Sequence, residues 1–242
     1  MQRSNFSAGI GMCEISRTFL CGNTPVLTLS IHYPKIVLCE HPAAQDNINR
    51  HIQTQVNHYY QYASNDLYTQ AIAAYQEAQK NGYPFHAFDA VLQYEVSYNR
   101  DCYLSLYRDQ YEFTGGAHGN TIRASDSWNL ANGCTMALSY FFLPGQAYRV
   151  FVIEQLLQQA DEQMQQNPGI FFKDYRKLIL EYFNENSYYL TPSGLAIYYQ
   201  QYEIAPYATG IVVFTIPYDT LKWQPSCRGA CGKAISGSSR RP

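Results

Sequence analysis

The sequence has few charged side chains. Asp, Glu, Lys and Arg make up 15% of the 242 residues, against about 25% in average proteins. The formal net charge of −2 excludes a globally basic nucleic-acid binder. A hydrophobic content of 46% excludes disorder as the overall state. The polar surface must therefore come from Gln, Asn and Ser, and from the 23 Tyr residues.

The charge is unevenly distributed along the chain. Residues 222–242 carry 5 basic side chains and no acidic one, whereas the remaining residues carry 12 basic and 19 acidic ones. We therefore predict an acidic folded body and a basic, disordered tail at 222–242. This acidic excess fits ordinary surface charge for solubility, and it also favours a cationic partner through an attraction that salt weakens.

Long hydrophobic runs are also absent. The longest apolar stretches, such as 211–214, are far shorter than the ~20 residues that span a bilayer. Glu14 and Arg17 interrupt the apolar residues near the N-terminus, so we expect neither a signal peptide nor a membrane span in this chain. Residues 1–23 are assigned to an N-terminal leader.

Sequence patterns of catalytic and metal sites are missing as well. GxSxG, Walker and GxGxxG patterns do not occur. The 7 Cys residues include one close pair, Cys227 and Cys231, whereas a zinc site needs two such pairs. Their odd number leaves at least one unpaired thiol in a monomer, and we expect Cys102 and Cys134 to be buried free thiols in strands. We expect no catalytic residue, metal or cofactor.

The apolar residues predict helices and strands in separate blocks. A repeat every three or four residues predicts a helix over 43–80 that ends at Asn81-Gly82, and alternation predicts a strand over 88–98. The other expected helices are 146–166 and 171–184, and the other expected strands are 24–40 with a break at Pro34, 102–113 with a bulge near 108–110, 120–131, 188–191, 195–199 and 211–218. This order indicates an α+β fold: an antiparallel meander with helices packed on one face, in two intimately packed halves, 24–133 and 134–221.

Two loops carry the most unusual local sequences. The first, 114–120, reads TGGAHGN, and Gly115 and Gly116 allow positive φ angles. His118 has no partner in a local metal or catalytic motif, so a structural loop and a partner-contacting loop both remain open. The second loop, 198–210, is rich in Tyr, which is favoured at binding surfaces and equally in a core. The candidate binding residues are Gly115, Gly116, His118, Tyr199, Tyr202, Glu203, Pro206 and Tyr207.

These loops also carry a family likeness. The runs YEFTGGAHGNTIRASDSWNL (111–130), YYLTPSGLAIYYQQYEIAPYATG (188–210) and FTIPYDTL (214–221) resemble the extracytoplasmic domain of anti-sigma-V factors of the RsiV type. They also resemble the accessory region that precedes the catalytic domain of PdaC-type peptidoglycan deacetylases. The resemblance covers roughly residues 24–221, and many relatives are bacterial proteins of unknown function.

The resemblance implies a domain of the Gram-positive cell envelope. In RsiV-like proteins this domain is a receptor for lysozyme, a strongly cationic protein that suits an acidic body. We therefore predict a non-enzymatic binding or sensor domain whose partner is lysozyme, another cationic protein or a cell-wall component, with 114–119 and 200–209 facing the partner. The sigma-binding segment of the first family and the catalytic HxxxH of the second do not occur in the sequence, so neither activity is carried over.

A structural domain without a ligand is a third interpretation, and the alternative from the enzyme class is a carbohydrate- or peptidoglycan-active hydrolase. It would use His118 with a nearby carboxylate as acid and base. The candidate carboxylates are Glu112, Asp126 and Glu203. This alternative predicts that His118 lies within hydrogen-bond reach of one of them.

Overall fold

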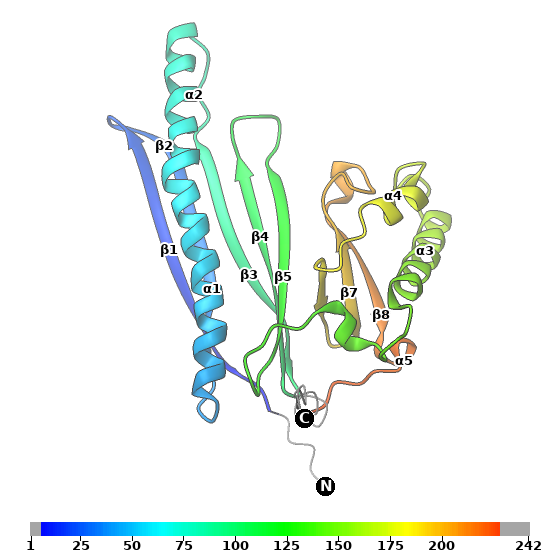
Figure 1. Ribbon diagram of the computed structural model, residues 1–242. Helices are drawn as coiled ribbons and strands as arrows, with labels where there is room; N and C mark the ends of the chain where they lie inside the picture. The colour runs from blue at the N-terminus through cyan, green and yellow to red at the C-terminus, as the bar shows by residue number, and fades with distance from the viewer. Residues whose placement is uncertain (1–5, 228–242) are drawn as a thin grey trace, which may run out of the picture.

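The computed structural model describes residues 6–227 and has an α+β fold, as predicted (Figure 1). The elements of the first half are β1 (Gly9–Cys21), β2 (Thr24–Val37), α1 (Pro42–Tyr62), η1 (Ala63–Leu67), α2 (Tyr68–Asn81), β3 (Phe88–Arg100), β4 (Tyr103–Phe113) and β5 (Asn120–Asn129). The elements of the second half are η2 (Leu138–Phe141), α3 (Tyr148–Gln166), α4 (Tyr175–Glu181), β6 (Tyr188–Leu190), β7 (Gly194–Tyr199), η3 (Tyr207–Thr209), β8 (Val212–Pro217) and α5 (Tyr218–Leu221). Among the described residues, no helix combines the length and the apolar character that crossing a membrane requires.

One long helical segment covers one face of the five-stranded sheet. It comprises α1, the short π-helical segment η1 and α2, and it matches the predicted helix 43–80 closely. Its apolar stripe is buried in the same core as the sheet, and Ile48, Ile52 and Val56 are at most 1% exposed. The segment ends at Gly82, whose φ of 72° is a left-handed conformation that glycine adopts without a steric penalty.

The five-stranded sheet is mixed, and not a purely antiparallel meander. Its order is β1-β2-β3-β4-β5, and every neighbouring pair is antiparallel except β2 and β3. These two strands are parallel because the long helix between them returns the chain to the end of the sheet where β2 began. The predicted meander is limited to β3, β4 and β5.

Residues assigned to a leader form a strand instead. β1 pairs with β2 over its whole length. It has no clear apolar alternation because it lies at the edge of the sheet and most of its side chains are exposed. β2 continues through Pro34, where the sequence predicts a break. Pro34 lies beyond Leu27–His32, the stretch that pairs with β3, so its missing N–H leaves no gap in that ladder.

The β3–β4 hairpin has its irregularity in β3. The register shifts between Val96 and Tyr98, and β4 pairs regularly at 108–110, where the sequence predicts a bulge. The aromatic pattern of β4 misleads because side chains over 107–113 are partly exposed on both faces. The predicted turn is present, and Asp101 and Cys102 adopt positive φ angles of 54° and 70° in it.

The second half packs on the face of β4 and β5 that points away from the long helix. Leu104 and Leu106 are buried toward the helix, so alternation turns Ser105 toward the second half. Ser105 Oγ lies 2.7 Å from Ser127 Oγ and accepts a hydrogen bond from the N–H of Leu190 in β6 (2.9 Å). The helix and the small sheet, of order β6-β7-β8, therefore lie on different sides of the large sheet (Figure 1).

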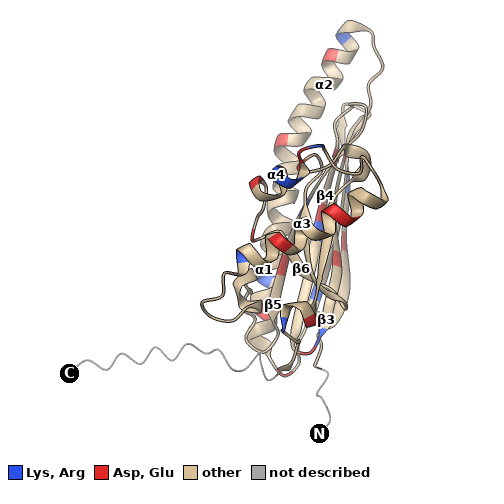
Figure 2. Ribbon diagram, turned by 90° about the vertical axis from the view of Figure 1, so that its right-hand side faces the viewer, with Lys and Arg blue, Asp and Glu red and all other residues tan. Residues whose placement is uncertain are grey.

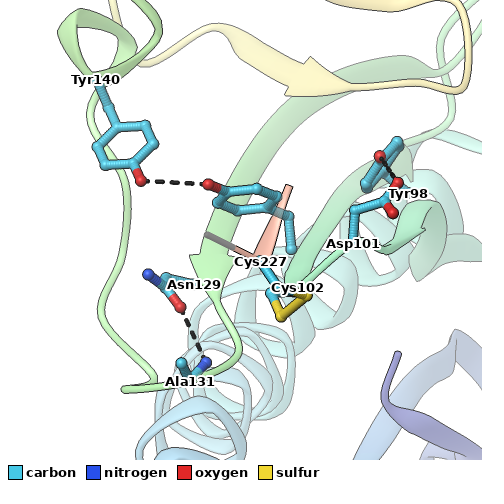
Figure 3. The surroundings of a disulfide bond; sticks show 8 residues. Tyr98, Asp101, Cys102, Asn129, Ala131, Tyr140 and Cys227 are labelled. Atoms are coloured by element: carbon cyan, nitrogen blue, oxygen red, sulfur yellow. Dashed lines mark hydrogen bonds between the residues drawn. A yellow bond between two sulfur atoms is a disulfide. The ribbon is translucent and has the colours of Figure 1, made fainter. Parts of the chain in front are cut away.

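A disulfide joins Cys102 at the β3–β4 turn to Cys227, the last described residue. Figure 3 shows it close to Asp101, whose carboxylate accepts a hydrogen bond from the Tyr98 hydroxyl (3.1 Å). The prediction of a free thiol at Cys102 is therefore wrong, because its partner lies 125 residues away and no local pattern marks it. Cys134 is a free thiol, but it is exposed and not buried.

The start of the predicted disordered tail is packed. Trp223 packs against other aromatic rings, with its ring centroid 4.9 Å from that of Phe141 and 5.6 Å from that of Tyr103. The prediction for 222–242 is therefore wrong for residues 222–227, where a large aromatic ring and the disulfide outweigh the polar composition. Residues 228–242 lie outside the described part of the chain.

Candidate binding surface

The first candidate loop connects β4 to β5, and two glycines shape it. Gly115 has a φ of 86°, which a residue with a side chain adopts only with strain. Gly119 lies against Tyr111, and a Cβ added there would lie 2.3 Å from Cε2 of that ring. The loop therefore turns tightly and exposes Gly116 and His118.

The second candidate loop connects β7 to β8 and is anchored in the core. Ile204 and Ala205 are buried, whereas Tyr202 is 51% exposed and has a positive φ of 66°. Pro206 directly precedes the short helix η3, which begins at Tyr207. The buried anchor between Tyr202 and Tyr207 holds both tyrosines at defined positions on the surface.

The two candidate loops meet, although 84 residues separate His118 from Tyr202. The ring of His118 stacks on that of Tyr207, with centroids 3.8 Å apart and an interplanar angle of 20°. His118 Nε2 lies 3.4 Å from the Tyr202 hydroxyl, and the Tyr207 hydroxyl donates to the carbonyl of Gly119 (3.0 Å). We call His118, Tyr202 and Tyr207 the aromatic cluster. It joins a loop of the first half to a loop of the second.

Two glutamines beside the aromatic cluster bind the edge of β5. Oε1 of Gln201 accepts from the N–H of Thr121 (2.9 Å), and Oε1 of Gln200 accepts from the N–H of Arg123 (2.9 Å). Nε2 of Gln200 donates to the carbonyl of Arg123 (2.7 Å). These amides replace the backbone of a neighbouring strand and fix the second loop beside the first. The sequence shows both glutamines but has no pattern that reveals this role.

Two of the predicted binding residues do not face outward. Tyr199 is 1% exposed, and its hydroxyl donates to the carbonyl of Ile179 (2.8 Å), so it belongs to the core. It ends β7, a strand buried along its whole length. Glu203 Oε2 accepts from the N–H of Gln200 (2.7 Å) and shapes the loop from within. Burial raises the pKa of Glu203 above its ordinary value, and this hydrogen bond opposes the rise.

The three carboxylates proposed as partners of His118 are engaged elsewhere. Glu112 accepts from the hydroxyl of Tyr62 (3.1 Å), Glu203 accepts from its own loop, and Asp126 is bound by Arg108. Within residues 6–227, no hydrogen bond or ion pair joins His118 to a carboxylate. The same residues contain no group of three or more His, Cys, Asp or Glu side chains placed to hold a metal ion. The geometry offers no support for the hydrolase alternative.

A His–carboxylate contact that the sequence does not reveal lies between α1 and β5. His51 Nε2 is 3.1 Å from Asp126 Oδ1, and Oδ2 of Asp126 accepts from Arg108 (2.8 Å) and Gln55 (2.9 Å). Burial alone would raise the pKa of Asp126. The hydrogen bonds from His51 and Gln55 and the charge of Arg108 outweigh burial, so the pKa lies below its ordinary value. The hydrogen bond to Asp126 raises the pKa of His51. The positive charge of Arg108 compensates the negative charge of Asp126, which is typical of a structural contact.

Charged side chains are sparse and scattered over the surface (Figure 2). Residues 6–227 carry 12 Lys or Arg and 19 Asp or Glu side chains. Five of the arginines are already paired with carboxylates: Arg100, Arg108, Arg123, Arg149 and Arg176. The described residues therefore carry an excess of negative charge, and much of their positive charge is already paired.

Two regions of the chain match known protein families. Residues 20–121 match the family described as Deacetylase PdaC, and residues 139–219 match the family described as Protein of unknown function (DUF3298). The chain combines a PdaC-type region with a DUF3298-type region. The PdaC-type region holds the long helix and most of the large sheet, and the DUF3298-type region holds the small sheet with its helices. No curated protein matches the chain.

Two solved structures share the fold. A member of the DUF3298 family from Bacteroides fragilis is 20% identical, with a TM-score of 0.69, over 91% of this chain and 94% of that chain. A DUF3298 family protein from Pseudomonas aeruginosa is 18% identical, with a TM-score of 0.57, over 92% of this chain and 94% of that one. Both similarities extend across the PdaC-type and DUF3298-type regions. The finer resemblance to anti-sigma-V factors stays a prediction.

Proposed function

We propose that the chain is a non-enzymatic binding domain of the bacterial cell envelope that recognises a cationic protein, with lysozyme as the first candidate. The observation that carries the proposal is the aromatic cluster. Loops from both halves converge there, and Tyr202 is 51% exposed although it is a large aromatic residue. The PdaC-type and DUF3298-type regions themselves suggest a non-catalytic accessory domain.

The chemistry of the surface suits a basic partner. Tyr offers a rigid ring with little conformational entropy to lose and a hydroxyl for hydrogen bonding. The overall excess of carboxylates in residues 6–227 speeds the approach of a cation and adds attraction that salt screens. The Cys102–Cys227 disulfide supports the envelope location, since such bonds persist in oxidising compartments.

The test is binding of lysozyme to the full chain, measured by size-exclusion chromatography and calorimetry at low and physiological salt. We expect a complex that weakens as salt rises. Tyr202→Ala should weaken it about tenfold or more, as expected for an aromatic side chain central to an interface. The matched control is Tyr182→Ala, because Tyr182 is also exposed, at 42%, but follows α4 outside the two loops.

The possible results test lysozyme as the partner and the aromatic cluster as the binding surface independently. Absence of a complex at low salt would remove lysozyme as the partner. A complex that Tyr202→Ala and Tyr182→Ala weaken equally would remove the aromatic cluster as the binding surface. Thermal unfolding of both variants shows whether either substitution acts through the fold.

A further inference from the structure

The two edges of the five-stranded sheet differ in what covers them. At β5, the side chains of Gln200 and Gln201 bind the backbone near one end, and residues 134–136 bind it near the other. At the opposite edge, β1 is 13 residues long and pairs only with β2 within residues 6–227. One edge is therefore closed and the other is open.

Pro34 shows which backbone groups face the open edge. In an antiparallel pair, successive residue pairs alternate between exchanging two hydrogen bonds and exchanging none. Pro34 lies opposite Met12 and has no N–H, so this pair is of the kind without hydrogen bonds. The N–H and C=O groups of Met12, and of every second residue after it, therefore point outward. The carbonyls of Ser16 and Leu20 agree with this assignment, because they accept from the side chain of Arg17 (3.0 Å) and from the hydroxyl of Tyr68 (2.6 Å).

β1 lacks the features that prevent exposed edges from pairing. Edge strands are usually protected by short length, Pro, Lys or a bulge. β1 contains neither Pro nor Lys, and its two charged residues, Glu14 and Arg17, have opposite signs. The register shift beside Phe19 inserts an extra residue, Val26, into β2 and leaves β1 regular. A second strand can therefore follow β1 from Met12 to Thr18, and beside Leu20 it meets the hydroxyl of Tyr68, which donates to the Leu20 carbonyl (2.6 Å).

Two exposed apolar side chains of β1 lie symmetrically about Ser16. Met12 is 58% exposed and Leu20 is 46% exposed. Both lie on the same face as Ser16, because alternate residues of a strand share a face. If two β1 strands pair antiparallel with Ser16 opposite Ser16, Met12 of each copy lies opposite Leu20 of the other. Cross-strand pairs of this kind are the unit of sheet stabilisation.

The charges of β1 restrict the register. Registers centred on Glu14 or Arg17 place like charges directly opposite each other, which destabilises an antiparallel pair. The register centred on Ser16 places neither charge opposite its own copy. The register centred on Ile15 also avoids this repulsion, but it leaves Met12 opposite a polar residue. Charge and apolar pairing together favour Ser16 as the centre.

We propose that the chain forms a two-fold symmetric dimer by antiparallel pairing of β1 with β1 of a second copy, centred on Ser16. The two five-stranded sheets then become one continuous sheet. The aromatic cluster lies beside β5, at the other edge, so the dimer carries one such cluster at each end. The dimer does not depend on the function proposed above.

The association is tested on the full chain by light scattering and sedimentation over a concentration series. Ser16→Pro removes an outward N–H that β2 does not use, so it should keep the fold and raise the dimer dissociation constant more than about tenfold. Met12→Lys should also raise the dimer dissociation constant, because it places a charge on the side of β1 that pairs. The matched control is Ile122→Lys on β5, because Ile122 is 52% exposed and lies far from β1 in the sheet order.

Cross-linking tests the register. Ser16→Cys should form an intermolecular disulfide at position 16, since directly opposed residues lie within the usual Cα–Cα range of disulfides. Peptide mapping distinguishes this link from any link through the native free thiols Cys13, Cys21, Cys39 and Cys134. A monomer at every concentration would overturn the proposal. So would a dimer that both Ser16→Pro and Met12→Lys leave intact, or one in which position 16 forms no link.

Discussion

The two faces of the five-stranded sheet use the same strands for different kinds of contact. On the helix face, Leu106 and Trp128 of β4 and β5 are 1% exposed in an apolar core. On the other face, Arg123 of β5 lies 3.9 Å above the ring of Tyr107 and donates to both carboxylate oxygens of Asp109 (2.8 and 2.7 Å). The first contact is apolar, and the second is ionic and aromatic.

The two faces contribute differently to the stability of the fold and to the orientation of the second half. Apolar burial is non-directional and roughly proportional to area, so the helix face contributes stability without demanding one arrangement. The Arg123–Asp109 contact requires fixed geometry and holds Arg123 within the large sheet. Directional hydrogen bonds then cross to the second half, from the N–H of Leu190 to Ser105 Oγ (2.9 Å) and from Nε2 of Gln200 to the carbonyl of Arg123 (2.7 Å), so this face determines how the second half sits on the sheet. Because the aromatic cluster combines loops of both halves, its geometry depends on the polar face.

The largest effect is expected from the disulfide, which connects the end of the second half to the β3–β4 turn. Cys227→Ala should lower the free energy of unfolding by about 4 kcal/mol, since the bond closes a loop of 125 residues. The measurement is urea unfolding with and without dithiothreitol. The reductant should destabilise the natural chain and leave Cys227→Ala unchanged. An equal response of both proteins would show that the bond adds nothing to stability.

The second effect concerns the apolar face. Leu106→Ala should lower the free energy of unfolding by about 3 kcal/mol, because it leaves a cavity where a 1% exposed side chain packs. The matched control is Leu180→Ala, since Leu180 is 54% exposed and should cost well under about 1 kcal/mol. The measurement is again urea unfolding. Similar losses for the two variants would contradict the assignment of stability to the helix face.

The third effect concerns the polar face. Arg123→Met should lower the free energy of unfolding by about 2 kcal/mol, because it leaves Asp109 without its partner in a largely buried contact. Asp109→Asn added to Arg123→Met should recover part of this loss, and a double-mutant cycle measures the coupling. Removing Arg149 from its exposed pair with Glu185 should have almost no effect. Additive losses at Arg123 and Asp109 would mean that the pair does not act as a unit.

The sequence predicts the fold where burial is one-sided. The long helix is visible because Ile48, Ile52 and Val56 all point into one core. The sequence pattern does not reveal β1, because both of its faces are largely exposed. The parallel pairing of β2 with β3 is not predictable either, because it depends on where the long helix returns the chain. The partner of Cys102 is likewise a matter of tertiary structure, since no local pattern points 125 residues ahead.

The candidate site was predictable as two loops but not as one surface. Glycine and tyrosine mark each loop in the sequence. Their meeting depends on Gln200 and Gln201 binding β5, a contact with no sequence pattern. Tyr199 and Tyr202 have the same side chain, yet one is 1% and the other 51% exposed. Composition cannot distinguish them. Tyr199 is buried because it is the last residue of the buried strand β7, whereas Tyr202 lies in the loop after it.

The smallest effect concerns pH, through the ionic contact on the otherwise apolar helix face. The pKa of His51 is raised in the folded chain, so its stabilisation is complete below the ordinary value of about 6.5 and is lost as pH rises through the folded value. The pKa of Asp126 is lowered, so its contribution is lost only as pH falls below about 3.9. Between pH 6 and 8 the free energy of unfolding should therefore fall, by less than about 1 kcal/mol because His51 is 41% exposed. His51→Gln should remove this slope in urea unfolding, and an unchanged slope would assign it to another group.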